Sequence, residues 1–312
     1  MIGGRKRKLS VWLRKGMLGY GNLLYPIVNR WRSISRPKIL GPGCDPREGK
    51  IPFYISFDLD YTKDIKNLPA LFDRLNQYNV KASFACIGKF IEMFPEEHRT
   101  ILLEGHEIVN HTYSHPDNDE LNPHSYYTEL SREEQFEEIQ KMQAVCEKIL
   151  QYKPIGFRLP HFGNVVEVDM PNLFRQLKSL GMIYDTSLLK FNIPNGKADI
   201  YETDVPGITE FSINTCPYHP FTACDSWHIF RSDRIVYRGI HHFKTFEETV
   251  KKLVEDCFHR QEMINIYLDP MDVVENNVFD YLMELAIPYC DFHPYRDFFK
   301  SSKLSVGKFF PS

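Results

Sequence analysis

Long apolar runs are missing from this sequence: no uncharged stretch reaches the roughly 18 residues that a membrane-spanning helix needs. Cysteine pairs of the CxxC type are also missing. The seven cysteines are scattered and odd in number, which favours reduced thiols over a disulfide framework. A secretory signal is not expected, because Arg14, Lys15 and Gly16 interrupt any apolar segment near the N-terminus. These absences predict a cytoplasmic protein and exclude a multi-span membrane protein.

The 312 residues are 43% apolar and 14% aromatic, so the chain can bury a sizeable core in one large or two ordinary domains. Its net charge of −3 is divided unevenly along the chain. Residues 1–44 hold ten Lys or Arg and no Asp or Glu, whereas the remainder holds 28 basic against 41 acidic residues. The acidic body makes nucleic acid an unsuitable partner, and the basic arm suits an anionic surface.

The arm, residues 8–34, places two Trp and several Leu and Tyr residues among basic side chains. Such a segment suits a membrane interface, which predicts peripheral contact with anionic lipid at the inner face of the membrane. A helix packed on the body, with its charges in water, explains the same pattern. Residues 36–52 are rich in Pro and Gly and are typical of a linker. The expected parts of the chain are an arm and linker at 1–50, a main domain at 51–300 and a tail at 301–312.

Beyond the linker, short β-rich runs alternate with segments of helical periodicity. The predicted strands are 53–58, 80–87, 106–110, 154–159, 182–185, 208–213, 263–268 and 287–292. The predicted helices are 68–79, 95–104, 131–151, 169–181, 246–259 and 276–286. Alternation of this kind indicates βαβ units and a parallel sheet, and about seven units favour a distorted (β/α) barrel. Residues 190–245 depart from the rhythm, and we expect long loops near the active face there.

Two carboxylates stand at the end of the first predicted strand, in Ser56-Phe57-Asp58-Leu59-Asp60. Side chains alternate along an extended chain, so Asp58 and Asp60 point the same way. Two such neighbours are costly unless a cation shares them, and one can ligate a metal while the other acts as a base. Two solvated loop acids are the other interpretation of the motif taken alone.

A pair of histidines follows the predicted strand 106–110, in His111-Thr112-Tyr113-Ser114-His115. Histidines four positions apart lie on one face of a helical turn, so we expect such a turn with both ring nitrogens directed at one ion. Two His and one carboxylate leave positions open for water and substrate, as a catalytic zinc requires.

An arginine ends the predicted strand 154–159, in Arg158-Leu159-Pro160-His161. An arginine fixed in place by a following proline can hold a carboxylate in a bidentate manner, and a pairing with Asp58 would keep that base oriented and ionised. An ordinary surface arginine in a turn is the other interpretation.

Together these segments resemble the polysaccharide deacetylases of carbohydrate esterase family four, which share the NodB homology domain. The resemblance covers roughly residues 50–295. Tyr184-Asp185-Thr186-Ser187-Leu188 is similar to the family's fourth motif. The first three family motifs are matched by Asp58 and Asp60, by His111 and His115, and by Arg158 and Pro160, with His161 where the family usually has an aromatic residue.

The resemblance implies a NodB-like barrel and a divalent metal, Zn²⁺ above all, bound by Asp60, His111 and His115. It implies that Asp58 is the general base, held by Arg158.

The resemblance further implies that the backbone N–H of His161 stabilises the oxyanion together with the metal. It places Tyr61, Pro160 and Asp185 at the substrate.

The family's fifth motif is altered here. Where the family has an apolar strand ending in Leu-His, with that His as the general acid, this chain has Leu268-Asp269-Pro270. Three interpretations stay open: Asp269 is a buried, protonated acid; His161 supplies the proton; or the domain binds a sugar without turnover.

The implied activity is hydrolysis of an N-acyl group, N-acetyl in the usual case, from an amino sugar. A nucleotide-linked or lipid-linked glycan precursor for a surface polysaccharide is the expected substrate. The alternatives are hydrolysis of a non-sugar amide or ureide on the same fold, and a catalytically weak carbohydrate-binding relative.

Overall fold

The computed structural model describes residues 49–123, 125–161, 168–190, 200–218, 222–230 and 245–301. The basic arm 8–34 and most of the linker lie outside these residues, as does all but the first residue of the expected tail. Among the described helices, none combines the length and the apolar character that crossing a bilayer requires.

One curled sheet forms the centre of the described domain, with the strand order β6-β7-β5-β4-β3-β2-β1-β8 and β9 beside β1. All neighbouring strands are parallel except β6 and β7. The strands are β1 (Ile51–Leu59), β2 (Ser83–Cys86), β3 (Glu107–Asn110), β4 (Gly156–Phe157), β5 (Tyr184–Asp185), β6 (Ile200–Glu202), β7 (Thr209–Phe211), β8 (Ile264–Leu268) and β9 (Cys290–His293).

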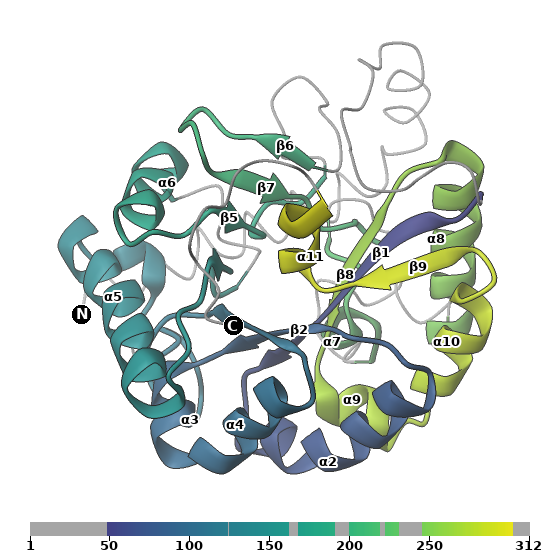
Figure 1. The fold of residues 1–312 in the computed structure, drawn as a ribbon, viewed down its shortest axis with the longest axis horizontal. Helices are drawn as coiled ribbons and strands as arrows, with labels where there is room; N and C mark the ends of the chain where they lie inside the picture. Colours follow the sequence, from purple (N-terminus) through teal and green to yellow (C-terminus); the bar gives the residue numbers. More distant parts are fainter. Residues whose placement is uncertain are drawn as a thin grey trace, which may run out of the picture.

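Most helices surround this sheet on its outer side, as the view down the ring shows, whereas α11 (Tyr295–Ser301) lies toward the centre of that view (Figure 1). Most of them connect one parallel strand to the next, as βαβ units require. They are α2 (Thr62–Gln77), α3 (Gly88–Met93), α4 (Pro95–Leu103), α5 (Arg132–Leu150), α6 (Met170–Ser179), α7 (Ser226–Phe230), α8 (Phe246–Arg260), α9 (Pro270–Glu275), α10 (Phe279–Ala286) and α11 (Tyr295–Ser301), with a 3-10 turn, η2, at Tyr127–Glu129.

The ring closes between the chain that follows β7 and strand β8. The backbone N–H of Asn214 donates to the carbonyl of Asn265 at 2.8 Å, and the N–H of Asn265 donates to the side-chain oxygen of Asn214 at 2.6 Å. The predicted distorted (β/α) barrel is therefore confirmed, with β1, β2, β3, β4, β5, β7 and β8 as its parallel wall.

Side chains alternate along β1 between two cores. Phe53, Ile55 and Phe57 pack outward into the cluster shared with the helices. Tyr54 points the other way, into a cluster inside the ring that also contains Tyr295. The inward positions thus form one line along β1 that leads from an aromatic core to the carboxylates at the strand's end.

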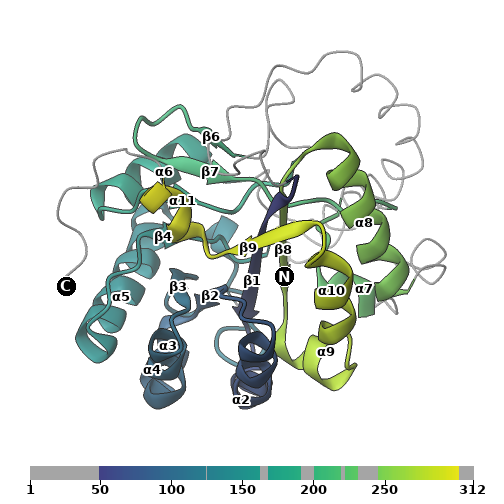
Figure 2. The same cartoon turned by 45° about the vertical axis from the view of Figure 1, so that its right-hand side comes forward.

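The first turn of α11 closes the end of the ring where the parallel strands begin. The N–H of Tyr295 donates to Ser83 Oγ at 3.1 Å, and the N–H of Arg296 donates to Glu107 Oε2 at 3.1 Å. Figure 2 shows α11 next to β9 at this end of the domain. Since Ser83 and Glu107 begin β2 and β3, the opposite end of the ring is left for the site.

Some predicted elements differ from the structure. The predicted helix 276–286 is present as α10, which begins three residues later, at Phe279. A further helix that was not predicted, α9, begins at Pro270 after β8, and Asn277, with φ of 55°, separates it from α10. The segment 190–245, expected to be loops, contains β6 and α7 among its described residues. In contrast, the Ser131 capping box begins α5 as predicted.

Candidate active site

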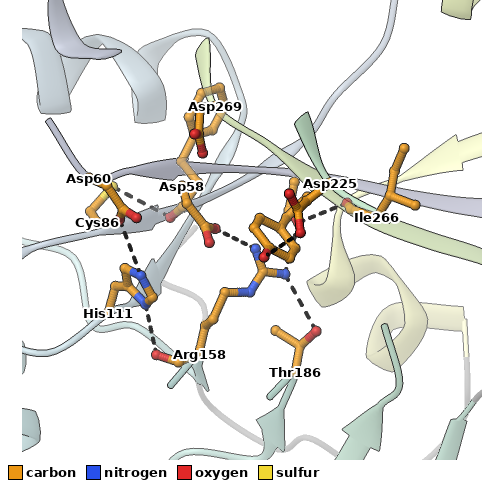
Figure 3. Close-up of polar contacts among 12 residues, drawn as sticks. Asp58, Asp60, Cys86, His111, Arg158, Thr186, Asp225, Ile266 and Asp269 are labelled. Atoms are coloured by element: carbon orange, nitrogen blue, oxygen red, sulfur yellow. Dashed lines mark hydrogen bonds and ion pairs between the residues drawn. The ribbon is translucent and has the colours of Figure 1, made fainter. Parts of the chain in front are cut away.

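The sequence motifs meet at the carboxyl ends of the parallel strands. Asp58 lies at the end of β1 and Asp60 follows it, His111 follows β3, Arg158 follows β4 and Asp269 follows β8. Figure 3 shows these side chains converging from separate strands on one small region. Carboxyl ends of barrel strands are where catalytic groups gather in such folds.

Asp60, His111 and His115 form a compact group. Asp60 Oδ1 lies 3.4 Å from Nε2 of His111 and 3.4 Å from Nε2 of His115. The two imidazole rings are inclined at 64° to each other, with centroids 4.8 Å apart. Among the described residues, this is the one group of three His, Cys, Asp or Glu whose potential ligand atoms all lie within 4.8 Å of one another.

The histidine segment is not the helical turn that its spacing suggested. Thr112 and His115 both have positive φ, at 66° and 49°, so the chain turns sharply twice after β3. Side chains stabilise this backbone, since Asn110 Oδ1 accepts from the N–H of Thr112 at 3.0 Å and Thr112 Oγ1 accepts from that of His115 at 3.1 Å. Left-handed conformations of residues other than Gly and Asn are costly, and they cluster at functional sites.

Two further residues attach this turn to its surroundings. Glu138 on α5 accepts from both the N–H and the hydroxyl of Ser114, at 2.7 and 2.9 Å. Asn118 donates through Nδ2 to the carbonyl of Asp60 at 2.6 Å, which joins the histidine turn to the end of β1. The mutual position of the carboxylate and the histidines therefore rests on specific contacts.

Charge in the group favours a bound cation. Burial acts to raise the pKa of Asp60, but the neighbouring histidines outweigh it and the pKa lies below its usual range. Burial lowers the pKa of His115 to about 3, so this ring is neutral and able to act as a ligand. Burial also opposes the charging of His111, yet the facing carboxylates raise its pKa, which means that a positive charge is attracted to this position.

The donor set fits a divalent metal. His111 Nδ1 lies 2.8 Å from the carbonyl oxygen of Arg158, a contact that places the proton on Nδ1 and leaves Nε2 free to coordinate. Asp60 Oδ1 and both ring nitrogens of His115 are buried and have no hydrogen-bond partner among the described residues. Buried polar atoms without partners are costly, and a cation with nitrogen and oxygen ligands would satisfy them.

Asp58 and Arg158 form a buried ion pair beside this group. Arg158 Nη1 donates to Asp58 Oδ1 at 2.5 Å, and the exposed fractions are 0% for Arg158 and 3% for Asp58. Burial raises the pKa of Asp58, while the guanidinium acts against this shift. The predicted pairing of the strand-end arginine with the first aspartate is therefore present.

Asp269 and Asp58 lie next to each other at the ends of two paired strands, β8 and β1. The register of β1 and β8 pairs Phe57 with Leu268, so the following residues, Asp58 and Asp269, take neighbouring positions that face the same side. The N–H of Asp269 donates to Ser226 Oγ at 2.8 Å, and the residue is 3% exposed. Burial, together with the nearby carboxylates, raises the pKa of Asp269 well above its usual value.

His161 is held against the histidine turn. Its ring centroid lies 4.7 Å from that of His115, and its Nε2 lies 3.1 Å from the carbonyl of Pro116. Its φ of 57° turns the chain at this point, and burial lowers the pKa of its ring. His161 is therefore engaged with the turn through both its ring and its Nε2.

The residues expected at the substrate differ in exposure. Tyr61 is half-buried at the rim, whereas Pro160 is buried and Asp185 has no exposed surface. Asp185 accepts from Ser187 Oγ at 2.7 Å, and burial raises its pKa to about 6. Its register partner is Glu210 on β7, so Asp185 lies in the wall of the ring.

Sequence reasoning missed several polar residues here. Ser56 shares the inward face with Asp58, so strand alternation was a signal for it. Asp225 accepts from the Tyr267 hydroxyl at 2.9 Å, and burial raises its pKa to about 7. Tyr295 contacts Arg158 from a helix 137 residues further along the chain, and no local pattern indicated this.

Comparison with known proteins points to one family. The profile of the family described as polysaccharide deacetylase matches residues 45–181. A peptidoglycan-N-acetylglucosamine deacetylase of Bacillus cereus is 32% identical over 113 residues, which are 36% of this chain and 38% of that protein. A chitooligosaccharide deacetylase of a Bradyrhizobium species is 39% identical over 62 residues, which are 20% of this chain and 28% of that protein. The match thus spans less than two thirds of either relative.

The fold is shared more widely than the sequence. A crystal structure assigned as a polysaccharide deacetylase of Mycobacterium smegmatis aligns with a TM-score of 0.65 and covers 89% of this chain and 99% of that one. The two sequences are 16% identical over this alignment, so the likeness is one of fold.

Proposed function

We propose that this protein is a metal-dependent hydrolase that removes an N-acyl group from an amino sugar, because residues 45–181 match the profile of the polysaccharide deacetylase family. The observation that carries the proposal is the position of Asp60 Oδ1, which is 3.4 Å from Nε2 of both His111 and His115. The buried pair of Asp58 and Arg158 beside it supplies a base. The N-acetyl group is the acyl group we propose, as in the B. cereus relative's name.

Asp60, His111 and His115 are the residues that would hold the ion, and Zn²⁺ suits their nitrogen and oxygen donors. When bound, a divalent cation at such a site lowers the pKa of a water molecule and polarises an amide carbonyl. The Nδ1 contact of His111 with the Arg158 carbonyl keeps the Nε2 lone pair directed at this position.

Asp58 accepts the proton of the attacking water. Its carboxylate shares the inward side of β1 with Asp60, and Arg158 fixes its orientation and opposes the rise of its pKa that burial causes. The backbone N–H of His161, at the sharp turn that follows Pro160, is the donor we propose for the oxyanion.

Asp269 is the residue we propose as proton donor to the departing amine. An amine leaves poorly without a proton, and Asp269 lies beside Asp58 with a pKa that burial raises. His161 is less suited to this role, because its Nε2 is engaged with the Pro116 carbonyl.

The substrate we propose is a glycan precursor linked to a nucleotide or a lipid. Support for a lipid-linked sugar comes from the arm 8–34, whose basic and aromatic residues suit an anionic membrane surface on the cytoplasmic side. Sedimentation with vesicles tests this part: deletion of residues 1–35 should abolish binding to anionic vesicles, and unchanged sedimentation would remove the membrane proposal.

Release of acetate tests the activity. The purified full-length chain is stripped with a chelator, reloaded with Zn²⁺ and incubated with N-acetylglucosamine oligomers and with a nucleotide-linked N-acetyl sugar. We expect acetate only after reloading. Absence of acetate from every substrate, with metal bound, would instead favour the carbohydrate-binding alternative.

A further inference from the structure

The Arg158 guanidinium has a second set of contacts, on the side away from Asp58. Nη1 donates to Asp58 Oδ1, and Nη2 donates to Ser56 Oγ at 2.8 Å and to the hydroxyl of Tyr295 at 2.7 Å. All four residues are at most 3% exposed. The arginine that orients the proposed base is therefore itself oriented by groups inside the ring.

We propose that Tyr295 is a positioning residue of this site: its hydroxyl fixes the guanidinium of Arg158 in the orientation that directs Nη1 at Asp58. The inference rests on the proposed function for its catalytic consequence. Tyr295 lies outside residues 45–181, to which the family profile extends.

The hydrogen bonds around Tyr295 have one consistent direction. The tyrosine has one hydroxyl proton, which it donates to Asn265 Oδ1 at 2.7 Å. The Asn265 amide is oriented in turn by its own donors, since Nδ2 donates to the carbonyls of Phe211 and Ser212 at 3.0 and 3.2 Å. A lone pair of the Tyr295 oxygen is therefore left to face Arg158 Nη2.

The two protons of Nη2 are then both assigned. One goes to Ser56 Oγ and one to Tyr295 Oη, at 2.8 and 2.7 Å, while Thr186 Oγ1 lies further away, at 3.5 Å from Nη2. The two short contacts restrict rotation of the planar guanidinium about its long side chain. Without the tyrosine oxygen, one Nη2 proton would keep only the more distant Thr186 Oγ1 as an acceptor, in a buried place. The guanidinium would then turn toward other acceptors, and Nη1 would no longer be held against Asp58.

The ring of Tyr295 is fixed as firmly as its hydroxyl. It stacks on Tyr54 with centroids 5.6 Å apart and planes at 7°, and it meets Phe211 edge-on at 5.1 Å. Its backbone N–H is bound to Ser83 Oγ at the start of β2. Helix α11 thus places a polar group in the ring from the end opposite to the rim.

Tyr295→Phe tests the proposal, with Tyr184→Phe as the matched control. Tyr184 is also fully buried and packs on Tyr295 at 5.4 Å, but its hydroxyl donates to Glu107 Oε1 at 2.9 Å. Both variants lose one buried hydroxyl from the same aromatic cluster, and the contact with Arg158 is lost in Tyr295→Phe alone.

We expect Tyr295→Phe to lower kcat roughly tenfold to hundredfold, with KM and bound zinc unchanged, because it affects the orientation of the base. Tyr184→Phe should keep the kcat of the unaltered protein. An unchanged kcat in Tyr295→Phe, or an equal fall in both variants, overturns the proposal.

A second measurement needs no activity and so separates this proposal from the proposed function. In the full-length protein labelled with ¹⁵N-arginine, the Arg158 side-chain signals are identified by their loss in Arg158→Lys. We expect slowly exchanging Nη protons with nuclear Overhauser contacts to the Tyr295 ring, and faster exchange in Tyr295→Phe. Absence of these contacts overturns the proposal that Tyr295 orients Arg158. If the contacts are present but no acetate is released, that proposal stands and only the proposed deacetylase activity is rejected.

Discussion

His111 and Arg158 are joined directly, because His111 Nδ1 lies 2.8 Å from the Arg158 carbonyl oxygen. The same arginine donates through its side chain to Asp58. One residue therefore sets the orientation of a proposed metal ligand through its backbone and that of the proposed base through its side chain. The metal group and the base are thereby linked through β4, so a displacement of this strand would disturb both.

Removal of a proposed ligand should abolish metal binding. Replacement of residues that merely orient a ligand costs about 10- to 100-fold in affinity, so His115→Ala should weaken zinc binding more than about 100-fold. The matched control is His98→Ala, which removes another buried imidazole, on α4. Metal analysis and zinc titration distinguish them: we expect His98→Ala to keep its zinc, and a zinc content in His115→Ala equal to that of the unaltered protein would contradict the assignment.

Removal of the proposed base should separate metal binding from turnover. Asp58→Asn keeps the shape of the side chain but cannot accept a proton, so we expect kcat to fall about 10²- to 10⁴-fold with zinc retained. The change also leaves the buried Arg158 charge without its carboxylate, so the free energy of unfolding should fall by about 3 to 5 kcal/mol. Acetate release, zinc content and urea unfolding are the three measurements, and substantial turnover in a folded Asp58→Asn would exclude Asp58 as the base.

Local sequence patterns were sufficient to predict which residues lie at the rim of the barrel. Alternation along β1 was enough to place Asp58 and Asp60 on one side, and adjacent parallel strands bring their carboxyl ends together. Capping and periodicity likewise gave α5, because Ser131 and Glu134 act within one turn. These predictions depend on neighbours in the chain or on a strand's own period.

The features of the site that could not be predicted from the sequence depend on contacts between residues that lie far apart in the chain, or on the detailed hydrogen bonding of a turn. The contact of Tyr295 with Arg158 depends on α11 closing the ring, which no segment near either residue encodes. The positive φ of Thr112 and His115 depends on side-chain contacts with Asn110 and with Thr112 itself, and the spacing of the histidines alone favoured a helical turn. Burial of Asp185 depends in the same way on the pairing of β5 with β7.

Replacement of Asp269, the proposed acid, should remove the fall in activity at high pH, which is the alkaline limb of the pH profile. A raised pKa keeps Asp269 protonated at low pH, and its power to donate is lost as the pH rises through that value. Asp269→Asn should therefore lower kcat about 10²- to 10⁴-fold and abolish that limb of the pH profile. Asp272→Asn, a change to a neighbouring carboxyl on α9, serves as the control and should keep the limb. If instead Asp269→His releases acetate where the unaltered protein releases none, the binding-only alternative holds.

A buried histidine outside the site should make the fold sensitive to acid. His106 is fully buried, its Nδ1 accepts from the N–H of Ala82 at 3.2 Å, and its ring stacks on Phe72. Burial, with the nearby Lys81 and Arg296 charges, lowers its pKa from 6.5 to about 3.

The native state therefore requires His106 to be neutral. Its contribution to stability is full above the unfolded pKa of about 6.5 and is lost as the pH falls toward the folded value. Between pH 7 and pH 5 this amounts to about 2 kcal/mol. Other buried groups titrate in the same range, among them Asp185 and Asp225, whose raised pKa values give a slope of opposite sign.

A variant isolates the histidine from those groups. In His106→Asn the amide oxygen can still accept from the N–H of Ala82 but does not titrate. We expect the free energy of unfolding of this variant to be lower than that of the unaltered protein at pH 7. Between pH 7 and pH 5 it should fall by less than that of the unaltered protein. Urea unfolding of both proteins at the two pH values measures the difference directly. The same pH dependence in both would mean that His106 is not held neutral by the fold, and that its burial between α2 and β2 does not exclude the charged ring.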